Sequence, residues 1–331
     1  MNHRAPGQIP FSRAITGFVN YKTAEGLSLR TVSGYQDLLE DWVKYTGDMP
    51  VSRVRPSDIS NYLNYMRTEY VPRRLSGDTR PLAPKTLRNF YITFASFFTW
   101  ASKELGVENP VKEIPAPRFQ RNPVNPFTQE ELQRMLKACL YAREAAPSNR
   151  RRFVMRRHTA NRDEAIILTL VDSGVRASEL CSLKIEDFDP KRGALVIKHG
   201  IEGGAKGGKG RTVYLGKTAR SAVWRYLAGR EDGEEQGAPL FVVLRGRPFT
   251  RSSLEHLIKR IGDRAGVKNV YPHKFRHTFA IMYLRSGGDV FTLQILLGHG
   301  SLDMVRYYAQ IAQVDVEQAH NRASPADHWR L

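Results

Sequence analysis

The chain has 331 residues, two cysteines (Cys139 and Cys181) and a formal net charge of +18. Two cysteines imply neither a disulfide framework nor a thiolate metal site. No apolar run reaches the roughly 20 residues of a membrane span, and the N-terminus lacks the apolar stretch of a signal peptide. We therefore expect an intracellular, cytoplasmic protein without a membrane partner.

The charge excess predicts a polyanionic partner, most simply nucleic acid. Residues 1–124 contain 17 basic and 11 acidic side chains, and residues 125–331 contain 34 basic and 22 acidic side chains. Because both halves are basic, we expect the partner to contact both. A generic basic surface that serves solubility is the alternative.

The first half of the chain predicts a helical domain over residues 11–118. Ser28 or Thr31 is a helix start, Gly47 is a stop, and the stretch SDIS at 57–60 caps a second helix. A third helix follows from about residue 84. Its apolar positions recur at helical spacing, which is typical of a core stripe rather than of a base-stacking platform: Leu87, Phe90, Phe94, Phe97, Phe98 and Ala101.

A proline-rich stretch over 108–128 predicts an extended connection, and we assign 119–127 as the linker. The second domain then covers 128–331, opening on a helix that Thr128 and Glu131 cap. The arginine-rich segment 144–162 follows. It is either a loop that tracks DNA phosphates or a solvated basic insertion.

Two helices are expected to meet at Gly174, and two strand-like runs, 194–200 and 211–216, predict a hairpin. The hairpin tip reads GGAKGGKG, which partly matches a nucleotide-binding G-x-x-x-x-G-K loop. Such a loop needs Ser or Thr after the lysine and a helix beyond it. Gly210 and a strand follow instead, so the sequence favours a flexible tip that presents two lysines.

The stretch YPHKFRHTFA places Pro272 at the first position of a helix. His273 and Arg276 then share one helix face, which favours an anion site. His273 and His277 also have the spacing of a zinc pair. Lys274 replaces the glutamate of that motif, and no third ligand is evident.

Several motifs in chain order resemble the active-site series of the tyrosine recombinases, the phage-integrase and Xer family. They are SGVRASEL, GAKGGKGRTVYL, HKFRHTFA and LLGHGSLDMVRYYAQI, and the resemblance covers roughly residues 11–315. It implies a mainly helical fold with a small antiparallel sheet. An N-terminal core-binding helical bundle and a helix-rich catalytic domain would form a C-shaped clamp around DNA.

The resemblance implies six catalytic residues, which are Arg176, Lys206, His273, Arg276, His299 and the nucleophile Tyr308. Tyr308 lies nine residues after His299, the spacing that the family shows, so Tyr307 is its neighbour. Glu179 and His277 match positions that hold or orient catalytic neighbours. Six further residues are expected to contact DNA, namely Lys209, Arg211, Lys274, Arg150, Arg151 and Arg152.

The implied activity is site-specific recombination through a 3′-phosphotyrosyl intermediate and a Holliday junction, with no metal or other cofactor. The implied partners are double-stranded DNA with inverted-repeat core sites and three further copies of the chain, a homotetramer on two sites. The apolar spacing of Ile311, Val314 and Val316 suits a tail that packs on another protomer or folds back on its own. The alternative functions are type IB topoisomerase-like relaxation and DNA binding without catalysis.

Overall fold

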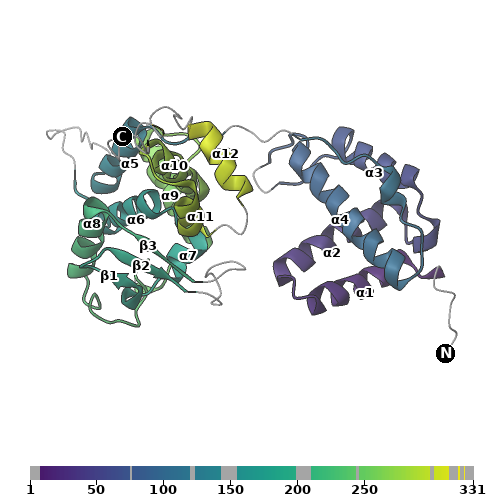
Figure 1. The fold of residues 1–331 in the computed structure, drawn as a ribbon, viewed down its shortest axis with the longest axis horizontal. Coiled ribbons are helices and arrows are strands. Elements are labelled where there is room, and N and C mark those ends of the chain that lie inside the picture. The colour runs from purple at the N-terminus through teal and green to yellow at the C-terminus, as the bar shows by residue number, and fades with distance from the viewer. Residues whose placement is uncertain are drawn as a thin grey trace, which may run out of the picture. The chain divides into compact units, whose positions relative to one another are not determined.

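The computed structural model describes residues 8–74, 77–119, 124–142, 155–198, 210–243, 246–298 and 302–312, together with His320 and Ser324. The chain divides into two compact units, Met1–Asn122 and Pro123–Leu331 (Figure 1). The division falls at residues of the predicted linker. Among the described residues, no helix is both long enough and apolar enough to cross a membrane.

The described residues of the N-terminal unit form four named α-helices and the short 3-10 helices η2 and η3. These are α1 (Phe11–Ala24), α2 (Leu29–Thr46), η2 (Val51–Arg53), α3 (Pro56–Thr68), α4 (Pro84–Glu104) and η3 (Pro110–Glu113). The Ser28 hydroxyl accepts a hydrogen bond from the Thr31 amide, so Ser28 is the start of α2. Gly47 ends α2 with a φ of 78°, as predicted.

Helix α3 begins earlier than the SDIS stretch predicts. Pro56 takes the first helical position, and the Asp58 carboxylate accepts a hydrogen bond of 2.8 Å from the Arg55 amide. The proline-rich stretch also differs from the expectation, because it contains the short helix η3.

The predicted stripe on α4 is the core of the N-terminal unit, and all six of its residues are buried. The Phe97 ring stacks on Phe11 of α1 at 4.5 Å between centroids. The Trp42 ring of α2 meets Phe94 edge-on at 5.2 Å. The aromatic side chains of α4 therefore hold α1 and α2 together and are not available to stack on bases.

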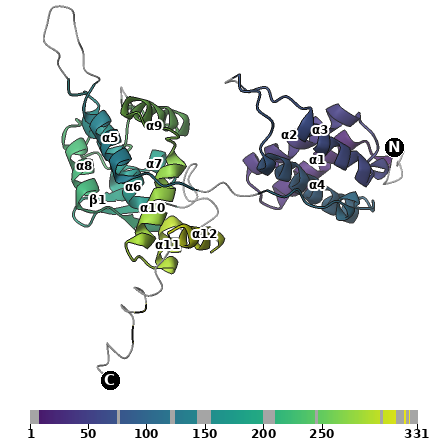
Figure 2. The ribbon, with the colours of Figure 1, turned by 90° about the horizontal axis from the view of Figure 1, so that it is seen from above.

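The C-terminal unit contains eight α-helices and a three-stranded antiparallel sheet among its described residues. Figure 2 shows its helices from a second direction. The elements are α5 (Gln129–Leu140), α6 (Ala160–Ser173), α7 (Ala177–Ser182), η4 (Ile185–Asp187), β1 (Phe188–Asp189), β2 (Ala194–Ile197), β3 (Arg211–Tyr214), α8 (Lys217–Ala228), α9 (Arg251–Ala265), α10 (Pro272–Arg285), α11 (Val290–Leu297) and α12 (Asp303–Ala312).

The sheet has the order β1-β2-β3, and Leu195 pairs with Val213 across the predicted hairpin. Both of these side chains are buried, whereas Tyr214 on the opposite face is exposed. Helices α6 and α11 contact β3, and α10 packs against both α6 and α12. This arrangement brings the ends of α6, α10, α11 and α12 toward one region of the unit.

Candidate active site

Two arginines converge where α6 and α11 end. Arg276 of α10 donates from Nη1 to the Gly174 carbonyl oxygen over 2.8 Å and from Nη2 to the Leu297 carbonyl oxygen over 2.5 Å. Arg176, just before α7, donates from Nη2 to the Gly298 carbonyl oxygen over 3.2 Å. Because Leu297 and Gly298 are consecutive, their carbonyls hold the two guanidinium groups close together.

Glycine is required at both helix ends that supply these carbonyls. Gly174 and Gly298 each have a φ of 62°, the left-handed conformation that disfavours other residues. A Cβ atom at Gly174 would lie 2.4 Å from the Phe279 ring, and one at Gly298 would lie 3.1 Å from Arg211 Nη1. The prediction that α6 ends at Gly174 is confirmed.

A buried carboxylate fixes the first arginine. Glu179 has no exposed surface; its Oε1 accepts from Arg176 Nη1 over 2.7 Å, and its Oε2 accepts from the Arg176 amide over 2.8 Å. Burial alone would raise the pKa of Glu179, but hydrogen bonds and charge from Arg211, together with Arg176, lower the pKa to about 2. Glu179 is therefore ionised and orients Arg176.

Arg211 departs from the expected role as a DNA contact. Its Nη1 and Nη2 donate to the two Glu179 oxygens over 2.9 and 2.7 Å, and its Nε donates to the Leu296 carbonyl oxygen over 2.7 Å. The side chain is 5% exposed. Because it pairs with Glu179 inside the unit, Arg211 supports the site from within, and we do not keep it as a DNA contact.

The sequence contained a signal for this buried position that the prediction did not use. Alternate residues of a strand face the same side of a sheet, so Arg211 lies on the same face as the buried Val213. An arginine on the inner face of a strand needs a buried carboxylate. Its partner Glu179 is 32 positions away along the chain.

Lys274 also differs from the expectation. Its side chain is 9% exposed, and Nζ lies 4.2 Å from the centroid of the Phe127 ring. This is a cation–π contact within the unit. We therefore do not keep Lys274 as a DNA contact either.

The two guanidinium groups create a site that favours an anion. Burial and the positive charge of Arg176 together lower the pKa of Arg276 to about 9, against the opposing effect of Glu179. Two cations near one carboxylate repel each other, and an incoming phosphate would relieve that repulsion. The planar guanidinium group also matches the geometry of phosphate oxygens.

Two histidines of α10 lie beside the arginines. His273 is the second residue of the helix, and Pro272 precedes it at the predicted first position. Burial, followed by the charge of Arg276, lowers the pKa of His273. Burial and the charges of His273 and Arg276 lower the pKa of His277 to about 4. Near neutral pH both rings are uncharged and able to accept protons.

Tyr308 of α12 reaches the same region. Its hydroxyl lies 2.7 Å from His277 Nδ1, and the side chain is 1% exposed. Burial raises the pKa of Tyr308 above 10, while the charge of Arg276 acts in the opposite direction. The charge of Arg276 favours the ionised phenol, but burial outweighs this effect in the present conformation.

The structure thus brings together Arg176, His273, Arg276, Tyr308 and the supporting residues Glu179 and His277. Among the described residues, no three His, Cys, Asp or Glu side chains gather as metal ligands would. The other site residues of the sequence analysis lie outside the described residues, namely Lys206, Lys209, His299, Arg150, Arg151 and Arg152.

Residues 125–314 match the sequence model of the phage integrase family. This match covers more than half of the chain, which therefore belongs to that family, the tyrosine recombinases. The chain is 28% identical over 316 residues to tyrosine recombinase XerA of Thermococcus kodakarensis, covering 94% of this chain and 95% of the relative. It is 27% identical over 320 residues to tyrosine recombinase XerC of Thermodesulfovibrio yellowstonii, covering 94% of this chain and 96% of the relative.

A solved structure shares the fold. The Tn1549 transposon integrase in complex with transposon right end DNA aligns with a TM-score of 0.69 at 18% identity, covering 91% of this chain and 94% of that chain. The predicted fold class, mainly helical with a small antiparallel sheet, is confirmed.

Proposed function

We propose that the protein is a site-specific recombinase that cleaves and rejoins duplex DNA through a covalent 3′-phosphotyrosyl intermediate and a Holliday junction. The observation that supports this most is the grouping of Arg176, Arg276 and Tyr308 around one positively charged site. The charge of Arg276 acts on the pKa of Tyr308, which supports a phenol position near the charges that would hold a phosphate.

The first step is attack of the Tyr308 hydroxyl oxygen on a DNA phosphorus. A tyrosine–phosphorus bond forms, and the bond from phosphorus to the 5′ oxygen breaks. The phenol proton passes to His273, and the leaving 5′ oxygen takes a proton from Lys206. A 5′ hydroxyl from another strand then reverses the step, so the phosphodiester energy is kept and ATP is not consumed.

Arg176 and Arg276 stabilise the charge that develops on the non-bridging oxygens. His299 hydrogen-bonds the same phosphate. Since the arginines supply the positive charge, we assign no metal or other cofactor to the reaction.

The buried position of Tyr308 is a resting arrangement in this proposal. The phenol has to leave His277 before it can attack, which requires α12 to shift. Binding of DNA in the correct register would drive that shift, because the phosphate neutralises the arginine pair.

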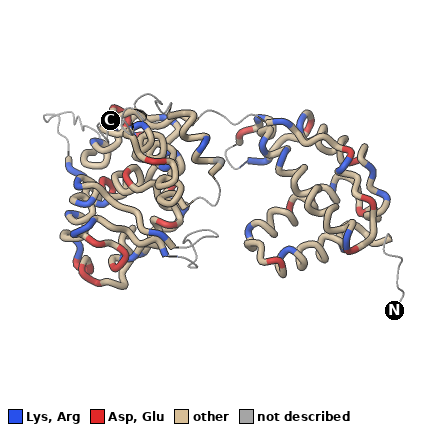
Figure 3. The backbone as a smooth tube through the Cα atoms, viewed as in Figure 1, with Lys and Arg blue, Asp and Glu red and all other residues tan. Residues whose placement is uncertain are grey.

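The DNA contacts would involve both units, on which lysine and arginine are widely spread (Figure 3). We propose a clamp around duplex DNA at inverted-repeat core sites in the cytoplasm, at the nucleoid. Most contacts would be to phosphates, with Lys209 and the Arg150–Arg152 segment among them. The affinity should then fall steeply with salt.

Assembly of four copies on two DNA sites is part of the proposal. Helix α11 exposes Phe291 and Ile295, with 64% and 66% of their surfaces accessible. They lie one helical turn apart, so they form an apolar patch that suits contact with another protomer. Changing both to glutamate should abolish complexes that contain two DNA sites while single-site binding remains. Ile92→Glu, at an exposed apolar position of α4, is the matched control.

The proposal is tested with labelled duplexes tiled over the DNA that flanks the protein's own gene. Incubation in EDTA should give a covalent protein–DNA adduct on at least one duplex, which a non-catalytic DNA-binding protein would not form. Two such sites should then yield a Holliday junction. A topoisomerase would form the adduct and relax supercoils without making junctions.

A further inference from the structure

The N-terminal unit contains a cavity that the proposed chemistry does not use. It lies between α2, α3 and the residues that follow α3, and it encloses about 430 Å³, enough for one long side chain. Four tyrosines line it together with one carboxylate and one lysine, which are Tyr45, Tyr62, Tyr65, Tyr70, Asp41 and Lys44.

The innermost tyrosine has an unsatisfied hydroxyl. Tyr62 is 1% exposed, and its oxygen is buried without a hydrogen-bond partner among the described residues. Burial raises the pKa of Tyr62 well above 10. Smaller increases come from four residues that line the cavity, namely Asp41, Tyr70, Tyr65 and Tyr45. Tyr62 is itself one of the residues that line the cavity. A buried oxygen without a partner is costly unless a ligand donates to it.

The charge around the cavity selects a cation. Asp41 lines the cavity, and the charges of Glu40 and Asp37 act together with Asp41 on Lys44, although the whole protein has a net charge of +18. Tyrosine faces can stack on nucleobases, but these carboxylates would repel the phosphates of a nucleic acid. The same faces attract an organic cation, and Asp41 supplies the counter-charge.

The geometry favours a guanidinium group over an ammonium group. Tyr45 and Tyr65 are stacked at 4.8 Å between centroids with an angle of 30° between their planes, and Tyr45 lies 5.0 Å from Tyr62. Flat aromatic faces suit a flat cation, which can also donate to Asp41 and to the Tyr62 oxygen at once. The exposed ammonium group of Lys44 lies 2.7 Å from Asp41 Oδ1, so it competes for the carboxylate from outside.

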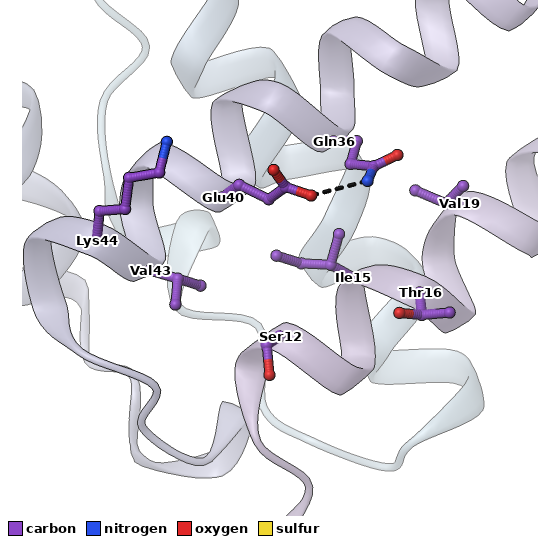
Figure 4. Close-up of a pocket in the computed structure, with 8 residues that line it drawn as sticks. All are labelled: Ser12, Ile15, Thr16, Val19, Gln36, Glu40, Val43 and Lys44. Atoms are coloured by element: carbon purple, nitrogen blue, oxygen red, sulfur yellow. Dashed lines mark hydrogen bonds between the residues drawn. The ribbon is translucent and has the colours of Figure 1, made fainter.

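In a neighbouring groove, two polar side chains of the lining are hydrogen-bonded to each other. It lies between α1 and α2 and shares Lys44 with the cavity (Figure 4). There the Gln36 amide donates to Glu40 Oε1 over 2.7 Å. The polar groups of that wall bind each other, whereas the Tyr62 hydroxyl in the cavity has no such partner.

We propose that the tyrosine cavity is a docking site for an arginine side chain presented by a basic segment of a partner protein. The guanidinium group lies against the tyrosine faces and donates to Asp41 and to the hydroxyl of Tyr62. Lys44 is displaced when the arginine enters. This site is separate from the proposed recombination chemistry, so either proposal can fail without the other.

The test uses the full chain with ¹³C-methyl methionine, because Met66 lines the cavity and reports on it by NMR. The probe is the peptide acetyl-Gly-Arg-Gly-amide, and its citrulline analogue is the neutral control. The arginine peptide should shift the Met66 methyl signal in a saturable way. The citrulline peptide and thymidine monophosphate should leave the signal unchanged.

Four variants make the result specific. Asp41→Asn should weaken binding roughly tenfold, the loss of one hydrogen bond to a charged group. Tyr62→Phe should weaken it about fivefold, with an unchanged or higher unfolding temperature because an unsatisfied hydroxyl is removed. Lys44→Met should strengthen binding up to about fivefold. Asp37→Asn, on the same helix but outside the cavity lining, removes a more distant charge and should weaken binding much less than Asp41→Asn.

Sedimentation of the wild-type chain and of Asp41→Asn identifies the source of the arginine. Absence of self-association supports another protein as the source, and self-association that the variant loses would overturn that assignment. The proposal is overturned if the citrulline peptide shifts Met66 as much as the arginine peptide does. Binding of thymidine monophosphate in preference to arginine, or no response to Asp41→Asn and Lys44→Met, also overturns it.

Discussion

Nδ1 of His277 and the hydroxyl oxygen of Tyr308 lie 2.7 Å apart, joining α10 to α12 in the interior of the C-terminal unit. The low pKa of His277 keeps its ring uncharged near neutral pH. The contact therefore holds a neutral phenol, and Tyr308 is 1% exposed. In this structure the pair keeps the proposed nucleophile out of solvent.

Removing the histidine side of this pair should make Tyr308 easier to modify. His277→Leu keeps much of the volume but deletes the hydrogen bond, so α12 should open more often. We expect acetylation of Tyr308 by N-acetylimidazole, followed by mass spectrometry of the DNA-free protein, to become several-fold faster. Tyr214, which is 54% exposed, should react equally in both proteins. Equal protection of Tyr308 in the two chains would contradict this role of His277.

Glu179 should make the protein sensitive to acid. The pKa of Glu179 is lowered from an ordinary 4.5 to about 2, so its stabilising effect is complete above pH 4.5 and is lost as the pH falls toward 2. The contribution is on the order of 3 kcal/mol. Chemical unfolding between pH 7 and 3 should show this loss in the wild type, and Glu179→Gln should be less stable at pH 7 with a flatter profile below 4.5.

Two comparisons isolate that effect. His277, whose pKa is lowered to about 4, adds a loss of stability between about pH 6.5 and 4 in both proteins. The contribution of Glu179 is therefore taken from the difference in unfolding free energy between the wild type and Glu179→Gln below pH 4.5. Glu186→Gln removes an exposed partner of Lys198 and should not alter the profile measurably. A Glu179→Gln protein as stable as the wild type at pH 7 would show that the buried cluster is not needed.

Gly298 should be less tolerant of alanine than a matched glycine. Gly298 and Gly266 both end helices with φ values of 62° and 63°. A Cβ atom at Gly266 meets nothing within 4 Å, whereas at Gly298 it approaches Arg211. Gly266→Ala should cost about 1 kcal/mol from the left-handed conformation alone. Gly298→Ala should cost more and should also reduce DNA cleavage, since it disturbs the carbonyl that binds Arg176.

Arg276→Lys should impair cleavage strongly although the charge is kept. A lysine cannot donate to the Gly174 and Leu297 carbonyls and also present a flat pair of donors to phosphate. We expect a loss of about 10²–10³-fold in the single-turnover cleavage rate. Arg285→Lys, at an exposed position of the same helix, should retain full activity. Near-normal cleavage by Arg276→Lys would remove Arg276 from the proposed phosphate site.

Local signals predicted many of the element ends, because caps depend on a few adjacent residues. Ser28, Thr128, Gly174 and Pro272 all have the predicted positions. Strand β1 was not predicted, since a two-residue strand has no period to detect.

The residue types of the site were predictable from the sequence, but the contacts between these residues were not. The pairing of Arg211 with Glu179 depends on how the sheet packs against α7, so a basic residue near a lysine-rich tip looked like a DNA contact. The burial of Tyr308 depends on the docking of α12 on α10, which no local pattern specifies.

The central claim is that Tyr308 is the nucleophile, and one comparison tests it directly. Tyr307→Phe and Tyr308→Phe are incubated in EDTA with the labelled duplex that gives an adduct with the wild type. Both changes remove one hydroxyl from adjacent residues of α12. We predict that Tyr307→Phe keeps the covalent protein–DNA adduct and that Tyr308→Phe loses it while still binding the DNA. An adduct that persists in Tyr308→Phe would contradict the account.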